Sequence, residues 1–308
     1  MSRVRLFFLL NCFSVWAADE LSVYERIQSA RAAIARHEFV AAVHQLLPTL
    51  AIARRAGATP ETEGEILNDL GYAYRMDGQC GNAIEALTAA APLLGSTPKA
   101  QMSRVYLIGS YLDCGQTLQA EAIWARSSVP LRLSDDSASL WAAGGTVEAA
   151  RGHYAKSEAL YDKAITFWER DSGKAPERLV LARISRAVDR AYLHRFDEAT
   201  ADIADVPVLS GVAPCVRAMA LSNVAVVQFL ASDLEGARTK FEEAIAAAGP
   251  EPTCSSIHVI LANYGALLRK MGDKATARSV ELRARQAADL LAARSGQTVD
   301  ARVLGSTR

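Results

Sequence analysis

The segment LNDLGYAY at residues 67–74 decides the fold, because it recurs in altered form as LANYGALL at residues 261–268. Both segments begin with leucine and carry glycine at the fifth position, and the sequence after each one also repeats. A glycine turn follows at the same distance, and then an alanine: Gly78-Gln79 with Ala83, and Gly272-Asp273 with Ala277. Glycine at such a point ends one helix and lets the chain reverse into the next. The sequence therefore predicts helix pairs joined by tight turns.

The turn and the small residue after it recur along the whole chain at spacings of 37 to 42 residues. The small residues are Ala42, Ala83, Ala120, Ser157, Ala199, Ala237 and Ala277. Four positions later most copies carry a bulky residue, namely Leu46, Leu87, Trp124, Tyr161, Ile203 and Phe241, and three positions later a small residue often returns. Such residues share one helical face, so this small–large–small pattern lets a neighbouring helix approach closely. One helix pair cannot bury its apolar face alone, so the copies are expected to stack.

These residues resemble the tetratricopeptide repeat (TPR) family, whose signature has an aromatic residue, Leu-Gly and Tyr in the first helix, then Ala, Phe and Ala in the second. Two copies match well: Trp141, Gly144-Gly145, Tyr154, Ser157, Tyr161 and Ala164, and Leu70-Gly71, Tyr74, Ala83, Leu87 and Ala90. The resemblance covers about residues 22–290. It implies an all-α fold, a right-handed α-solenoid of about seven antiparallel helix pairs, each longer than the usual ~34 residues.

The N-terminal segment, residues 1–17, is typical of a secretory signal peptide. Arg3 and Arg5 precede the apolar run LFFLLNCF at residues 6–13, and Ala17 supplies the small residue before the expected cleavage. The run is shorter than the ~20 residues that cross a bilayer. We expect a periplasmic or secreted protein with no transmembrane segment in the mature chain. A retained anchor and a buried first helix are the alternatives.

The mature chain divides into a helical array over residues 18–294 and a tail over residues 295–308. The last helix should continue through Leu290 and Leu291 to about Arg294 before Ser295-Gly296-Gln297 releases the chain. Val299, Val303 and Leu304 could fold back to cap the exposed end of the stack, since solenoids need a cap. A disordered tail is the alternative.

Four cysteines remain after removal of the signal segment: Cys80, Cys114, Cys215 and Cys254. An even number in an exported protein is typical of disulfides, here with three possible pairings. Each of the pairs Cys80–Cys114 and Cys215–Cys254 lies near the turns or helix starts of adjacent copies. We therefore predict these two disulfides. Four buried reduced cysteines are the alternative.

The fifth copy departs from the pattern. If its first helix kept the same register as the other copies, Arg183, Arg186 and Arg190 would point toward the core. Burying three unpaired guanidiniums costs several kcal/mol each. A shift of two positions, which buries Leu181, Ile184, Ser185 and Val188 instead, avoids that cost. The arginines then form a stripe that could bind an acidic peptide. The alternative, which we favour, is a solvated face paired with Glu177, Asp189 and Asp197.

The first helices of a stacked array form a concave face that can hold an extended or helical peptide. Besides the three arginines, the candidate partner-binding residues on this face are Asn68, Tyr72, Arg75, Met102, Leu112, His258 and Arg269. The apolar members could instead pack against neighbouring helices. Some TPR domains clamp a terminal carboxylate with lysines and asparagines. The second and third copies present Glu65, Asn68, Tyr72, Met102, Val105 and Gly109 at these positions instead. No lysine is available there, so we expect no such clamp.

Other function classes find little support. The 34 basic and 34 acidic residues balance, which argues against a nucleic-acid footprint. No glycine-rich phosphate loop, nucleophile elbow or paired-cysteine metal motif is present, and the five histidines are scattered. We expect a non-enzymatic interaction scaffold that binds a protein or peptide, with no cofactor, no metal, no nucleic acid and no small-molecule ligand. The alternative is a cytoplasmic regulatory or sensor module that keeps its N-terminus.

Overall fold

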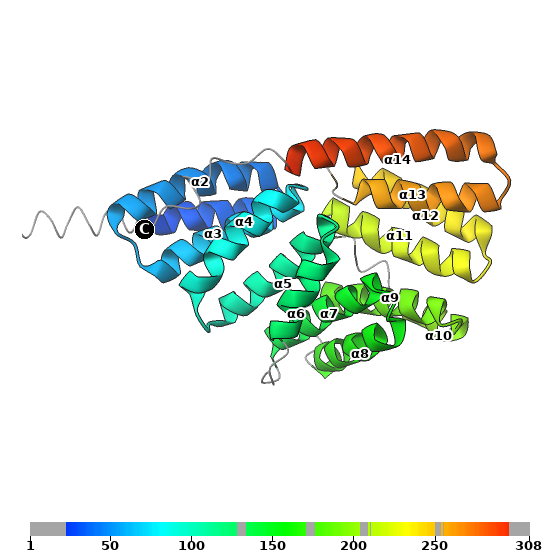
Figure 1. Ribbon diagram of the computed structural model, residues 1–308, viewed down its shortest axis with the longest axis horizontal. Helices are drawn as coiled ribbons and strands as arrows, with labels where there is room; N and C mark the ends of the chain where they lie inside the picture. The colour runs from blue at the N-terminus through cyan, green and yellow to red at the C-terminus, as the bar shows by residue number, and fades with distance from the viewer. Residues whose placement is uncertain are drawn as a thin grey trace, which may run out of the picture.

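The computed structural model describes residues 23–127, 134–170, 176–203, 209, 211–249, 254 and 256–295. These residues form α-helices and no strand (Figure 1). The first helix covers residues 23–35, and the others are α2 (Phe39–Ala56), α3 (Pro60–Met76), α4 (Cys80–Leu94), α5 (Pro98–Asp113), α6 (Thr117–Ser127), α7 (Asp135–Ala150), α8 (Tyr154–Arg170), α9 (Pro176–Tyr192), α10 (Phe196–Asp202), α11 (Pro214–Leu230), α12 (Leu234–Ala248), α13 (Ile257–Lys270) and α14 (Lys274–Ser295). They form the seven antiparallel pairs that the repeat predicts.

The small–large–small pattern forms the contacts between the helices of each pair. All seven small residues are fully buried, from Ala42 in α2 to Ala277 in α14. Gly71 in α3 shows how closely the helices approach, since a Cβ added there would lie 2.4 Å from Leu87 Cγ in α4. A side chain at this position would separate the two helices. The Leu-Gly motif therefore exists for packing, as the sequence pattern predicts.

The turn inside each pair has one conformation throughout the array. Its central residue has positive φ in every pair, and it is glycine in four of them: Gly78, Gly115, Gly152 and Gly272. His37, His194 and Ser232 take the same conformation in the first, fifth and sixth pairs, at φ of 63°, 60° and 69°. The left-handed region disfavours residues that carry a Cβ. The repeat therefore imposes this turn even where the sequence lacks glycine.

Proline and threonine define the starts of several first helices. Helices α3, α5, α9 and α11 each begin with proline, whose missing N–H costs nothing at that position. Thr59 and Thr97 cap α3 and α5, and their hydroxyl oxygens accept hydrogen bonds from the backbone N–H of Thr62 and Ala100 at 3.2 and 3.3 Å. These signals fix where the first helix of a pair begins.

The first helices of the pairs lie on the inside of the array, and we call the surface they form the inner face. Helix α5 packs against α3 and α7, and α11 packs against α9 and α13. In Figure 1, α5, α7, α9 and α11 occupy the middle of the view, with α2, α8, α10 and α14 around them. The array also curves back on itself, because α14 contacts α4 (Figure 1). His37 Nε2 lies 3.4 Å from the carbonyl oxygen of Gly211, which joins the first turn to the segment before α11.

Both predicted disulfides are present and link adjacent pairs. Cys80 at the start of α4 is bonded to Cys114 after α5, and Cys215 in α11 is bonded to Cys254 before α13. Their Cα atoms are 5.7 and 5.0 Å apart. The predicted signal peptide and the predicted tail after Ser295 lie outside the described residues. Within the described helices, none combines the length and apolar character needed to cross a membrane.

Candidate functional site

An open pocket of about 250 Å³ lies on the inner face where four consecutive first helices meet. The helix over residues 23–35, α3, α5 and α7 each contribute to its wall. Its lining residues are Arg31, Glu65, Asn68, Asp69, Pro98, Lys99, Met102, Tyr106 and Asp136. We call it the α3–α5–α7 pocket. A pocket built from four repeats exists only in the stacked array, so no single helix pair could form it.

Ion pairs that cross between repeats neutralise one side of the pocket. Arg31 Nε donates to Asp69 Oδ2 at 2.6 Å, and Arg31 Nη2 donates to Glu65 Oε2 at 2.9 Å. Lys99 pairs with the other oxygen of Glu65. Burial raises the pKa of Asp69 even though Arg31 opposes that rise. Two cations thus balance two carboxylates across three adjacent first helices.

Asp136 has a different environment from the other two carboxylates. Among the described residues its side chain has no hydrogen bond or ion pair, although the charge of Arg178 acts on it at longer range. Burial, followed by repulsion from Asp135, raises the pKa of Asp136 even though Arg178 opposes that rise. Its neighbour Asp135 is fully engaged, since it accepts from Trp168 Nε1 at 2.7 Å and pairs with Arg178. Asp136 is therefore the one pocket carboxylate without a partner among the described residues.

Aromatic rings continue from the pocket along the inner face and on to the start of α2. Tyr106 lies 4.8 Å from Tyr72 between ring centroids, and Tyr72 meets Phe39 edge-on at 6.2 Å. Burial raises the pKa of Tyr106 to about 12, so its hydroxyl stays protonated at neutral pH. Aromatic side chains on a wet surface provide apolar contact area at a small entropic cost. The three rings extend an apolar surface from the pocket toward the first turn.

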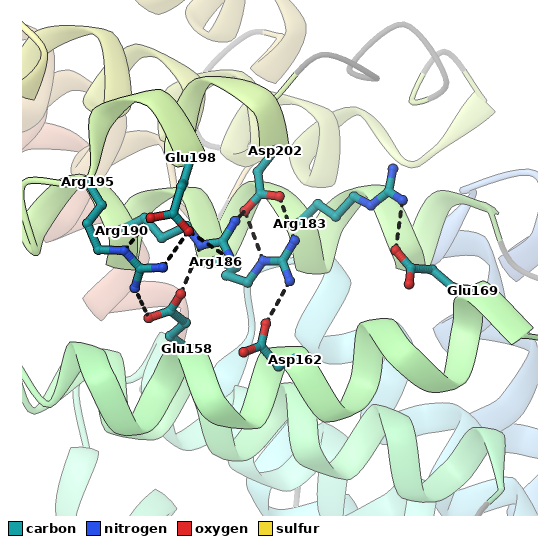
Figure 2. A network of polar contacts seen from close by, with 9 residues as sticks. All are labelled: Glu158, Asp162, Glu169, Arg183, Arg186, Arg190, Arg195, Glu198 and Asp202. Carbon is teal, nitrogen blue, oxygen red and sulfur yellow. Dashed lines mark hydrogen bonds and ion pairs between the residues drawn. The ribbon is translucent and has the colours of Figure 1, made fainter.

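The arginines of α9 form a second polar cluster, shown in Figure 2, between α8, α9 and α10. Arg186 donates to both oxygens of Asp202 and to Asp162 Oδ1. Arg190 joins Asp202 to Glu158, at 2.8 and 2.9 Å. Burial opposes the charge of Arg186, but these carboxylates outweigh it and raise its pKa. At its ends, Arg183 pairs with Glu169 at 2.9 Å, and Arg195 pairs with Glu158 and Glu198.

This cluster corrects two parts of the sequence interpretation. Arg183, Arg186 and Arg190 are half-buried rather than solvated. The described carboxylates that pair with them are not the predicted Glu177, Asp189 and Asp197 but Glu158, Asp162, Glu169, Glu198 and Asp202. The carboxylates come from α8 and α10, which face α9 across the helix interfaces. Of the four residues expected to be buried by the shifted phase, Ile184 is buried, whereas Leu181, Ser185 and Val188 are half-buried.

Asp189 is the residue that the sequence interpretation misplaced most. It is fully buried, and neither carboxylate oxygen has a donor at hydrogen-bonding geometry among the described residues. The nearby Ser157 hydroxyl donates to the Gly145 carbonyl oxygen at 2.8 Å. Burial, opposed by the Ser157 hydroxyl and reinforced by Glu158, raises the pKa of Asp189 to about 7.

The remaining candidate residues fall into separate environments. Asn68 and Met102 line the pocket, and Tyr72 adjoins it through Tyr106. Three others make structural contacts: Arg75 pairs with Asp113 at 2.8 Å, Arg269 pairs with Glu281 at 2.5 Å, and Leu112 packs against a core that includes Ile108. His258 instead has a buried Nδ1 without a hydrogen-bond partner among the described residues. The structure thus brings together three of the seven inner-face candidates outside the arginine stripe.

The sequence interpretation missed several pocket residues, Lys99 among them. The statement that the second and third copies present no lysine is wrong, because Lys99 lines the pocket. Its ammonium group is already paired with Glu65. Lys99, Met102 and Tyr106 are three and four residues apart, which places them on one face of α5 and could have identified them. In the described residues no group of histidine, cysteine and acidic side chains is placed to hold a metal ion.

Comparison with known proteins identifies the fold but no sequence relative. No family model matches the chain, and no curated protein matches it. Among solved structures, the apo form of RapI has a TM-score of 0.65 at 12% identity, covering 87% of this chain and 99% of that chain. A Rap protein complexed with Competence and Sporulation Factor has the same TM-score at 13% identity, covering 89% and 76%.

A third solved structure is larger than this chain. The APC/C hetero-tetramer Cut9–Hcn1 has a TM-score of 0.57 at 12% identity, covering 85% of this chain and 42% of that chain. At these identities the likeness concerns the path of the backbone. It agrees with the seven helix pairs, the buried small residues and the repeated turn. The chain therefore has the tetratricopeptide repeat fold, a helical solenoid of seven stacked pairs.

Proposed function

We propose that this protein is a non-enzymatic scaffold that binds an extended segment of a partner protein, or a free peptide, on its inner face. The observation that carries the proposal is the convergence of four first helices on the α3–α5–α7 pocket. Tyr106, Tyr72 and Phe39 continue the surface beyond it. A concave face with apolar contact area and a few charged groups suits an extended chain.

The structural neighbours support a binding role. A Rap protein of this fold has been solved in complex with Competence and Sporulation Factor, and Cut9 has been solved in a hetero-tetramer with Hcn1. A preformed surface favours such binding, because a rigid array loses little entropy when its partner binds.

We also propose that the protein acts outside the cytoplasm, in the periplasm or as a secreted protein. Two disulfides between adjacent pairs support this location, since disulfides persist in oxidising compartments. The arginine pair and apolar run of residues 1–17 support it independently. N-terminal sequencing of the protein expressed in a bacterial host tests it. A mature start at Ala18 is expected, and an intact Met1 in the cytosol would contradict export.

Peptide selection tests the binding function without knowledge of the partner. The purified protein is used to select from a phage-displayed library of random peptides, and enriched peptides are synthesised and titrated by fluorescence polarisation. Met102→Trp fills the pocket with a bulky neutral side chain and should weaken binding at least tenfold. Leu118→Trp, which makes the same kind of change on α6 where Leu118 is 77% exposed, is the matched control and should bind normally.

The outcomes separate the two parts of the proposal. Selection of no peptide would contradict peptide binding. Enriched peptides that bind Met102→Trp and Leu118→Trp equally well would place binding away from the inner face. Thermal unfolding of both variants shows whether the array remains folded.

A further inference from the structure

We infer that the α3–α5–α7 pocket receives a basic side chain, lysine or arginine, from the bound peptide. This inference rests on the proposed peptide-binding function and specifies the ligand chemistry of one position. It is carried by the geometry of the pocket, in which one carboxylate is left without a partner beside an apolar wall.

The charge balance of the pocket favours a cation. Arg31 and Lys99 both form short ion pairs with Glu65 and Asp69, so the charges of these four groups cancel. Among the described pocket residues, Asp136 then adds one negative charge that no ion pair balances. Arg178 in α9 forms its ion pair with Asp135, and its charge acts on Asp136 only at longer range. An ammonium or guanidinium group from a ligand would supply the missing partner.

The shape of the pocket suits a long side chain with a charged end. Met102 and Tyr106 line the same pocket as Asp136, and Pro98 adds to the apolar wall. The methylene groups of lysine or arginine can lie against such a wall while the charged end reaches the carboxylate. The Tyr106 ring offers a further attraction for a cation placed over its face.

Other side chains fit this pocket less well. An acidic side chain would be repelled by Asp136 and by Asp135, which lies in the same first turn of α7. A neutral apolar side chain would cover the Asp136 carboxylate without donating a hydrogen bond to it. Burying a polar group without such a partner is costly. The pocket therefore discriminates by charge as well as by shape.

Methionine-methyl NMR tests the pocket directly, because Met102 is one of only five methionines in the chain. The protein is labelled at its methionine methyl groups, and the Met102→Leu variant assigns the Met102 signal. Nα-acetyl-lysine amide and Nα-acetyl-arginine amide are titrated against Nα-acetyl-norleucine amide, which has a similar apolar stem without the charge. We expect the Met102 signal to shift with the two basic probes and not with the neutral one.

Two variants make the same chemical change at different places. Asp136→Asn should weaken the response to the basic probes about tenfold, since a charge-assisted contact is lost. Asp289→Asn, on an exposed part of α14, should leave it unchanged. The signals of Met219 and Met271 report whether each variant keeps its fold.

Each contrary result overturns the inference. An equal shift with the norleucine probe would show an apolar pocket without charge preference. An unchanged response of Asp136→Asn would show that this carboxylate does not hold the cation. No shift with any probe would remove the pocket as a subsite. Peptide selection, which uses no single amino acid as a probe, can still succeed in each case, so these failures are distinct from failure of the proposed function.

Discussion

Arg186 in α9 forms a two-point ion pair with Asp202 at the end of α10, with Nε to Oδ2 at 2.9 Å and Nη2 to Oδ1 at 2.6 Å. Asp202 also accepts from Arg190 at 2.8 Å, and its side chain is only 7% exposed (Figure 2). One carboxylate thus forms ion pairs with two half-buried guanidiniums at once. The ion pairs therefore join α9 to the short helix α10 alongside an apolar cluster that includes Ala187, Ala191 and Ala199.

Asp202→Ala should destabilise the array strongly. Its removal leaves Arg186 with Asp162 and Arg190 with Glu158, so the loss should be about 2–3 kcal/mol, below the cost of a buried charge left wholly unpaired. Glu169→Ala is the control, because Glu169 is exposed and ion pairs with an exposed partner contribute about 0–1 kcal/mol. Urea unfolding followed by circular dichroism measures both. Equal, small losses would show that the cluster of Figure 2 contributes little to stability.

Asp189→Asn should stabilise the protein more at pH 8 than at pH 5. The folded-state pKa of about 7 lies above the usual value of 3.8, so the folded state favours the protonated carboxyl. As the pH rises from about 4 to 7, ionisation penalises the folded state progressively, up to about 4 kcal/mol above pH 7. Between pH 5 and pH 8 the advantage of the asparagine variant should grow by about 2–3 kcal/mol. Asp289→Asn should show no such pH dependence.

Ser232→Gly should stabilise the turn between α11 and α12. Ser232 is exposed and has φ of 69°, where a residue with Cβ is strained by about 1 kcal/mol. Gly152→Ser makes the reverse change in the equivalent turn between α7 and α8, where no atom lies within 4 Å of an added Cβ. The two variants should shift the free energy of unfolding by similar amounts in opposite directions. A stabilising Gly152→Ser would contradict a conformational origin.

The two disulfides should each contribute measurably to stability. They close loops whose ends are 34 and 39 residues apart, which corresponds to about 3–4 kcal/mol in the chain-entropy model. The Cys80→Ala/Cys114→Ala double variant should therefore unfold at lower urea than the parent. Peptide mapping under non-reducing conditions checks the pairing. Recovery of the four cysteines as free thiols from the periplasm would contradict both the bonds and their role.

The repeat could be derived from the sequence because its signals are local. The spacing from Ala83 to Leu87 places both on one helical face regardless of what surrounds them, and Gly78 ends a helix for reasons confined to its own backbone. The disulfide pairing followed from the same spacing, since stacking places equivalent positions of adjacent copies side by side. The turns at His37, His194 and Ser232 were harder to recognise, because there the neighbouring helices impose a conformation that the residue itself disfavours.

What each charged side chain contacts depended on the tertiary structure. Arg186 reaches Asp162 and Asp202, and Lys99 reaches Glu65, only because neighbouring helices present those carboxylates at the right height and angle. Asp136 meets Met102 in one pocket for the same reason. The sequence by itself determined the helices, their turns and their order, through interactions within a few residues. Small rotations between successive repeats add up to the curvature of the array. Only the assembled array therefore decided which side chains from different repeats come into contact.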